Sequence, residues 1–176
     1  MNIAIYGAGY VGLATSVVFA DWGHNVTCYD IDEEKIKQLN NKIMPFYEPK
    51  MEHYVCNGLE RGKLKFTSDS WETTFSDIIF VCVGTPPNSD GSPNMQYVES
   101  AIKTISYDYK NDKEKIIVLK STVPVGTHLI ADSILKSNNK SNFIIVNSPE
   151  FLRESDAIAD AQNPDRIIIG TNNQKA

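Results

Sequence analysis

The chain lacks the features that would place it in a membrane, a disulfide-bonded scaffold or a nucleic-acid complex. No apolar run reaches the roughly 18 residues that a membrane-spanning helix needs, and the first residues lack the basic and apolar regions of a secretory signal. The three cysteines are odd in number and have no metal-ligand spacing, which favours reduced packing residues in the cytoplasm and no bound metal. The net charge is −5 and no basic block occurs, which argues against nucleic acid as a partner.

What the chain does have, from its seventh residue, is a glycine loop between an apolar stretch and a helical pattern. Residues 3–6 are typical of a buried strand, and residues 11–22 have helical periodicity. Gly7 allows a tight turn, Gly9 lets the backbone approach a phosphate, and Gly12 lets the helix pack on the strand. Because a helix N-terminus attracts anions, this stretch predicts a binding site for a dinucleotide pyrophosphate.

An acidic residue completes this pattern. Residues 25–30 predict the next strand, and Asp30 stands 18 residues after Gly12, close to the expected interval of about 20. A carboxylate there accepts hydrogen bonds from ribose hydroxyls and repels a 2′-phosphate, which favours NAD over NADP. Asp32 is placed to cap the following helix, and Lys35 is placed to reach the ribose or a phosphate, with a solvated surface lysine as the alternative.

The rest of the chain continues the alternation of strands and helices. Further strands are expected at 63–67, 78–83, 115–120, 142–146 and 166–170, and helices at 32–40, 50–57, 94–106 and 124–136, with Pro124 in the first turn of the last one. This order predicts an α/β fold, a Rossmann-type doubly wound and mostly parallel sheet with helices on both faces, in one domain over residues 1–176. The irregular segment 41–49 is too apolar for a linker and is expected to pack on the domain.

Ligands of such sheets bind outside the carboxyl ends of the strands. The polar residues at the expected strand ends therefore converge on one crevice; beyond the glycine loop and Asp30 they are Thr85, Ser121, Thr122 and Glu150.

Several motifs together resemble the UDP-glucose and GDP-mannose dehydrogenase family. They occur in the family's order and cover almost the whole chain; they are the glycine loop 7–13, Gly84-Thr85-Pro86, the stretch 120–126, the stretch 148–154 and Pro164-Asp165-Arg166. The match is nearest to the UDP-glucose 6-dehydrogenases. The resemblance implies NAD-dependent oxidation of the C6 alcohol of UDP-glucose to UDP-glucuronate, with two hydride transfers through an enzyme-bound thiohemiacetal and thioester, in the supply of polysaccharide precursors.

The glycine pattern and the resemblance together assign site residues. The expected cofactor-binding residues are Gly7, Gly9, Tyr10, Val11, Gly12, Asp30, Lys35, Thr85, Pro86, Ser121, Thr122 and Glu154. The nucleotide-sugar substrate is expected at Glu150, Phe151, Leu152 and Arg153, and catalysis at Thr122, Glu150 and Glu154.

The chemistry of these side chains supports the assignments unequally. The Thr122 hydroxyl both donates and accepts, so it can hold a water or a carboxamide, although a helix cap is the alternative. If their turn is helical, Glu150 and Glu154 share one face and repel, so that one of them can hold a proton for acid–base work. Two ordinary surface glutamates are the alternative there, and Arg166 is expected to be structural, pairing with a carboxylate or a strand end.

The chain departs from the family in one respect. The family's nucleophilic cysteine lies in a later G-x-C-x-P-K-D-type motif with an oxyanion-stabilising lysine, and no such segment occurs here. Cys28 and Cys82 lie in expected strands and Cys56 in a short helix, so none takes that role. The chain is thus expected to be the amino-terminal domain of a longer, homodimeric enzyme, binding NAD weakly and inactive without its central helix and nucleotide-binding second domain.

Other interpretations stay open. The parent enzyme acts on UDP-N-acetylmannosamine or GDP-mannose in one of them, and the chain is a stand-alone dinucleotide-sensing module in another. A Rossmann-like methyltransferase is disfavoured, because it would not bring Thr85-Pro86 and the stretch 150–154 along with the glycine loop.

Overall fold

A computed structural model describes residues 1–110, 113–140 and 142–173. Within these residues the chain forms one sheet of six parallel strands in the order β3-β2-β1-β4-β5-β6. The strands are β1 (Asn2–Tyr6), β2 (Asn25–Tyr29), β3 (Leu64–Thr67), β4 (Ile78–Val81), β5 (Lys115–Leu119) and β6 (Phe143–Asn147). The strand order reverses between β1 and β4, so the glycine loop after β1 opens at the switch point where doubly wound sheets bind ligands.

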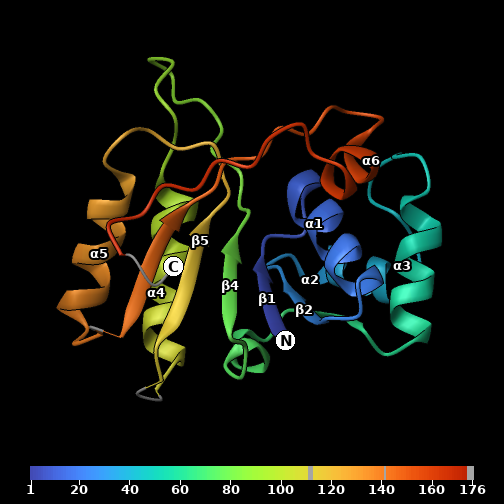
Figure 1. Ribbon diagram of the computed structural model, residues 1–176, viewed down its shortest axis with the longest axis horizontal. Coiled ribbons are helices and arrows are strands. Elements are labelled where there is room, and N and C mark those ends of the chain that lie inside the picture. Colours follow the sequence, from blue (N-terminus) through green and yellow to red (C-terminus); the bar gives the residue numbers. More distant parts are fainter. Residues whose placement is uncertain (111–112, 141, 174–176) are drawn as a thin grey trace.

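Helices cover both faces of the sheet, as the sequence predicted (Figure 1). One side carries α1 (Tyr10–Asp21), α2 (Glu33–Asn40), α3 (Met51–Glu60) and α6 (Ala157–Gln162), and the other carries α4 (Gln96–Asp108) and α5 (Thr127–Ser137). A 3₁₀ turn, η1 (Ser70–Thr73), precedes β4. No helix in the described part of the chain is long and apolar enough to cross a bilayer.

Strand β1 shows why its sequence has to be apolar throughout. Ile3 and Ile5 point into the core under α1 and α3, whereas Ala4 and Tyr6 point into the core under α4 and α5. Alternate side chains of a strand face opposite sides, so a strand covered on both faces needs apolar residues at every position. The sequence expectation for this segment is confirmed.

Gly23 follows α1 with φ +92°, a left-handed conformation suited to glycine, and its N–H donates to Ala20 O at 3.0 Å. Two local predictions from the sequence are confirmed. The Asp32 carboxylate caps α2 by accepting from the Lys35 N–H at 3.0 Å. The segment 41–49 packs on the core through Met44 and Phe46.

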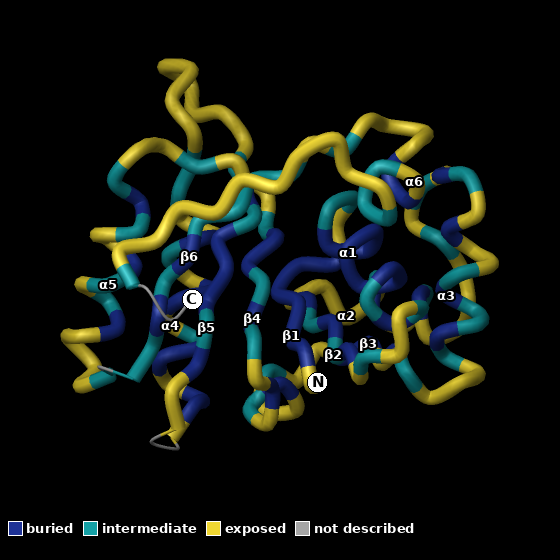
Figure 2. Tube along the Cα trace, viewed as in Figure 1, coloured by how far each residue is buried: buried dark blue, intermediate teal, exposed yellow. Residues whose placement is uncertain are grey.

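Two expectations were wrong. Residues 166–170 form no strand: only Gly170 pairs, through one antiparallel bridge to Asn147, and the isoleucines before it are exposed (Figure 2). Pro124 precedes rather than enters its helix, because Gly126, at φ +94°, turns the chain before α5 begins at Thr127.

The condition under which Glu150 and Glu154 would share one face, a helical turn, is not met. Residues 148–153 have no regular structure. Pro149 has no N–H to donate, and the Arg153 N–H bonds to the Asp160 carboxylate at 2.8 Å, so neither residue joins a helical ladder across this stretch. The two glutamates therefore do not form an i,i+4 pair on a helix.

Candidate functional site

The glycine loop forms an open cradle at the start of α1. A Cβ on Gly9 would meet nothing within 4 Å, whereas a Cβ on Gly12 would lie 1.8 Å from Gly7 O. The first backbone bond of α1 runs from the Leu13 N–H to Gly9 O at 2.8 Å, so the N–H groups of Tyr10 and Val11 precede the helical ladder. No side chain caps this end and no acid occupies the first turn. The end of α1 thus offers free space, donors and a positive dipole to an anion.

The Asp30 carboxylate lies beside this cradle at the end of β2 and is 8 % exposed. Its Oδ2 accepts the Ala8 N–H at 2.7 Å and the Lys35 ammonium at 3.0 Å, and its Oδ1 accepts the Asp32 N–H at 3.0 Å. A carboxylate has about four acceptor sites. Three are thus occupied by the protein, and Oδ1 keeps one for a ligand hydroxyl.

A cavity of about 350 Å³ joins these groups to α4. The predicted residues Gly7, Gly9, Asp30 and Lys35 line it together with Gly84. Sequence reasoning missed the opposite wall, which includes Tyr97, Ser100 and Thr104 of α4. Their spacing of three and four residues puts them on one helix face, and that periodicity was the available signal.

Three further predicted residues meet at the ends of β4, β5 and β6. The Thr85 hydroxyl donates to Thr122 O at 3.0 Å, and the Thr122 hydroxyl donates to Glu150 Oε1 at 3.1 Å. Glu150 Oε2 is buried and has no hydrogen-bond partner among the described residues. A buried carboxylate oxygen without a partner is costly in a native fold. It commonly marks a functional group or a position that accepts a hydrogen bond from a ligand.

Ser121 and Pro86 make contacts within the domain. The Ser121 hydroxyl is buried against Val81 O and Val83 O, at 3.2 and 2.6 Å. Pro86 is exposed, and its carbonyl accepts the Asn94 N–H at 2.8 Å at the base of the loop that stands above the sheet (Figure 1). The Ser121 side chain is therefore directed to the strand ends rather than to the cavity beside the glycine loop.

The segment expected to hold the substrate borders a second cavity of about 500 Å³ on the α1 side of the sheet. Glu150, Phe151 and Leu152 line it, but the Arg153 guanidinium turns to Asp160 of α6, at 3.1 Å from Nε and 2.7 Å from Nη2. These hydrogen bonds raise the pKa of Arg153 and lower that of Asp160. Arg166, expected to pair with a carboxylate or a strand end, instead stacks over Phe151, 5.1 Å from the ring centre.

Tyr10 lies at the start of α1, and its hydroxyl contacts the segment expected to hold the substrate. The hydroxyl lies 2.9 Å from Arg153 O and 2.6 Å from the Glu48 carboxylate. Burial first, then the hydrogen bond to Glu48 and the charges of Glu48 and the exposed Glu154, raise the pKa of Tyr10. Sequence reasoning missed Glu48, although a single acid within an apolar irregular segment was a signal.

The cysteines are placed for packing. Cys28 and Cys82 are buried, and burial raises the pKa of the Cys28 thiol to about 12 and that of Cys82 also well above its ordinary value. Both are therefore thiols at neutral pH and poor nucleophiles. Cys56 lies half-buried on α3 and lines neither cavity.

Known proteins are similar in sequence to this chain. Residues 1–176 match the NAD binding domain of the UDP-glucose/GDP-mannose dehydrogenase family. The UDP-glucose 6-dehydrogenase of Rickettsia conorii is 44% identical over 177 residues, which cover 100% of this chain and 40% of that protein. A UDP-glucose 6-dehydrogenase of Bacillus subtilis is also 44% identical, over 99% of this chain and 38% of its own length.

Solved structures of dehydrogenases are also similar to this chain. The GDP-mannose dehydrogenase of Pseudomonas aeruginosa, in a ternary complex, superposes with a TM-score of 0.95 at 31% identity, over 99% of this chain and 42% of that one. A UDP-glucose dehydrogenase from Pyrobaculum islandicum superposes with a TM-score of 0.92 at 33% identity, over 99% and 41%. The chain thus spans about 40% of the length of the curated relatives it matches.

Proposed function

The chain belongs to the UDP-glucose/GDP-mannose dehydrogenase family as its NAD-binding domain, and from this premise we propose that it is the cofactor half of a longer UDP-glucose 6-dehydrogenase. The parent enzyme oxidises the C6 alcohol of UDP-glucose to the carboxylate of UDP-glucuronate. This chain supplies the NAD site and one wall of the sugar site. The nucleophilic cysteine and most nucleotide contacts come from the remainder of the parent.

One observation carries the proposal: the Thr122 hydroxyl and the Glu150 carboxylate, one oxygen of which is buried, meet at the ends of β5 and β6. Thr122 and Glu150 are 3.1 Å apart, and Glu150 Oε2 is unpartnered among the described residues. A module that only senses a dinucleotide needs the loop and Asp30 but gains nothing from a carboxylate oxygen that is buried without a partner. Such a pair is suited to holding a water or a substrate hydroxyl and to moving its proton.

The residues present fit NAD. The open space over Gly9 and the first N–H groups of α1 receive the pyrophosphate, and the remaining acceptor site of Asp30 Oδ1 receives a ribose hydroxyl. Bound NAD supplies hydride acceptance from the alcohol carbon. Thr85 fixes Thr122 through the Thr122 carbonyl, so the Thr122 hydroxyl is held toward Glu150, where a proton can be accepted.

The remaining assignments follow from the same proposal. Glu154, beside Tyr10, contacts the cofactor, and Phe151 and Leu152 form an apolar wall against the sugar nucleotide. Arg153 acts mainly by attaching its segment to α6, because its guanidinium is hydrogen-bonded to Asp160. We also propose that the parent is a cytoplasmic homodimer that supplies UDP-glucuronate for polysaccharide synthesis.

The test is turnover by the full-length protein with NAD and each of three sugars: UDP-glucose, UDP-N-acetylmannosamine and GDP-mannose. Steady formation of reduced cofactor with UDP-glucose alone is expected, and the 176-residue chain is expected to bind NAD without turnover. Preference for GDP-mannose would favour a GDP-mannose dehydrogenase as the parent enzyme. That alternative is supported by the TM-score of 0.95 to a GDP-mannose dehydrogenase. Absence of turnover with all three sugars would contradict the proposal.

A further inference from the structure

Glu48 is a buried carboxylate in the irregular segment 41–49, and it binds two distant parts of the chain. It is 4 % exposed. Its Oε2 accepts the Tyr10 hydroxyl at 2.6 Å and the Ser155 N–H at 2.9 Å, and its Oε1 accepts the Ala157 N–H at 2.9 Å. Burial of a carboxylate is costly unless donors satisfy it, so these three donors hold Glu48 in one position.

The donors belong to the two halves of the proposed site. Tyr10 directly follows Gly9 in the cradle, and its ring also packs against Phe46, 5.5 Å away. Ser155 and Ala157 directly follow the stretch 150–154 and lead into α6, which lies over the end of α1 (Figure 1). The Tyr10 hydroxyl also reaches Arg153 O at 2.9 Å. A single carboxylate thus joins the cradle to the segment that carries Glu150.

The backbone conformation of Ser155 indicates that contacts from outside the segment 150–157 hold it in place. Ser155 has φ +71°, the left-handed region that residues other than glycine rarely adopt. Such a conformation persists only where surrounding contacts fix it. Glu48 accepts from the N–H of Ser155 itself and from the N–H of Ala157 two residues later, and these bonds provide that constraint.

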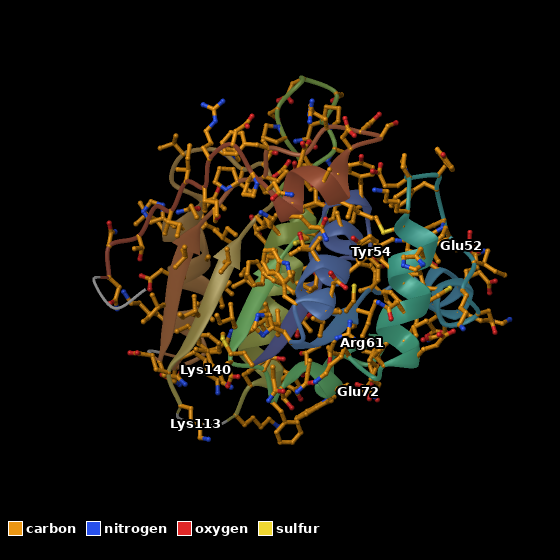
Figure 3. The ribbon with its side chains drawn as sticks, turned by 45° about the vertical axis from the view of Figure 1, so that its right-hand side comes forward. Glu52, Tyr54, Arg61, Glu72, Lys113 and Lys140 are labelled. Atoms are coloured by element: carbon orange, nitrogen blue, oxygen red, sulfur yellow. The ribbon has the colours of Figure 1, made fainter. Side chains whose placement is uncertain are left out.

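Another hydrogen bond near α6 does not reach the proposed site. Tyr54 of α3 accepts a hydrogen bond from Gln162 at 3.0 Å, and it lies at the end of α3 nearer α6, away from Arg61 (Figure 3). That bond braces α6 against α3 but reaches neither the cradle nor the stretch 150–154. Glu48 bonds to both sides, which is why its contacts bear on the site rather than only on the packing of α6.

We propose that Glu48 is a positioning residue that couples the glycine loop, through Tyr10, to the segment 150–157. The inference rests on the proposed function, because it assigns Glu48 a part in aligning the cofactor cradle with the Glu150 side of the same site. Glu48 does not touch the reacting groups itself. It fixes the position of the glycine loop relative to the segment 150–157.

The test compares Glu48→Gln with Tyr10→Phe in the 176-residue chain. The amide of a glutamine replaces one acceptor oxygen by a donor, so at least one of the Ser155 and Ala157 N–H groups loses its partner. We expect NAD binding by E48Q to weaken about tenfold in calorimetric titration, and exchange of at least one of the Ser155 and Ala157 amides to accelerate at least tenfold by NMR. Core amides of β1 and β4 should keep their protection.

Tyr10→Phe tests the coupling separately, since it keeps the ring packing on Phe46 and removes only the hydroxyl. It should accelerate exchange at Ser155, and the double variant should lose no more NAD affinity than about the larger single loss. Glu60→Gln is the matched control: Glu60 forms an exposed ion pair with Lys42 at 2.7 Å, so its change should leave both readouts within about twofold.

Unchanged NAD affinity in E48Q would overturn the proposal, and so would faster exchange throughout the core, which would make Glu48 a general packing residue. Additive losses in the double variant would show that Glu48 does not act through Tyr10. If the wild-type chain itself fails to bind NAD, the proposed function fails. The coupling is then decided by Tyr10→Phe alone, and unaltered exchange at Ser155 would exclude it.

Discussion

Gly9 and Gly12 are three residues apart, but an added methyl group should lower NAD affinity at Gly9 and folding stability at Gly12. A Cβ on Gly12 would lie 1.8 Å from Gly7 O and 2.9 Å from Gly7 C, both backbone atoms, whereas real Cβ contacts stay above 3.0 Å. To accept it, α1 must move from β1 by more than an ångström in a fully packed region. Overpacking of well-packed sites costs about 1–3 kcal/mol and occasionally more, so we expect Gly12→Ala to lose about 3 kcal/mol or more.

Gly9→Ala meets no such obstacle. Its Cβ has nothing within 4 Å, and φ is −84°, which alanine adopts freely. Alanine is a poorer residue than glycine at a helix N-cap, so the expected loss of stability is no more than about 1 kcal/mol. The methyl group would project into the space that we assign to the pyrophosphate. NAD binding should weaken at least about tenfold, equivalent to about 1.4 kcal/mol.

Urea unfolding and calorimetric titration of both variants separate the two effects. Gly12→Ala should shift the unfolding midpoint strongly, with loss of binding as a secondary effect of unfolding. Gly9→Ala should unfold close to the wild-type midpoint yet bind NAD poorly. A folded Gly9→Ala variant with wild-type NAD affinity would refute the reasoning, because the pyrophosphate would then lie elsewhere.

Three further outcomes follow from the site. Asp30→Ala should weaken NAD binding by about tenfold or more and narrow its preference over NADP, and a wild-type preference for NADP in the same titration would contradict the ribose assignment. Thr122→Val in the full-length protein should lower kcat by about a hundredfold or more, and undiminished turnover would remove Thr122 from the chemistry. With its pKa raised to about 12, only about one Cys28 thiol in ten thousand is ionised near pH 8. Thiol titration of the native chain should therefore count Cys56 alone, and all three cysteines only after denaturation; rapid reaction of Cys28 or Cys82 in the native chain would contradict their burial.

The geometry of the glycine loop and its neighbouring acids could be predicted from sequence because its determinants are local. The turn at Gly7, the approach at Gly9 and the cap at Asp32 depend on φ angles and hydrogen bonds within a few residues, and each leaves its own residue type in the sequence. Asp30 required only one further step, the pairing of β1 with β2. The structure places these groups around one cavity, as their spacing indicated.

The C-terminal stretch was harder because its conformation depends on distant partners. The three isoleucines 167–169 have the composition of a strand, but only Gly170 finds a pairing partner, at Asn147. The spacing of Glu150 and Glu154 suited a helix, but the contacts of Arg153 with Asp160 and of Ser155 with Glu48 favour an irregular path. Propensity is a weak guide wherever such long-range bonds decide the backbone.

Glu48 explains why the two halves of the site differ so much in predictability. The cradle is encoded within residues 7–35, whereas the backbone that follows the stretch 150–154 is bonded, at Ser155 and Ala157, to a carboxylate more than a hundred residues before it in the chain. A short-range pattern can specify where a phosphate binds, but it cannot specify how far that phosphate lies from an acid on another strand. That distance requires a contact bridging the two segments, and Glu48 with Tyr10 provides one. Substitutions in the cradle that leave the fold intact should therefore act on NAD affinity alone, and substitutions at this bridge on NAD affinity together with the exchange of the amides that Glu48 binds.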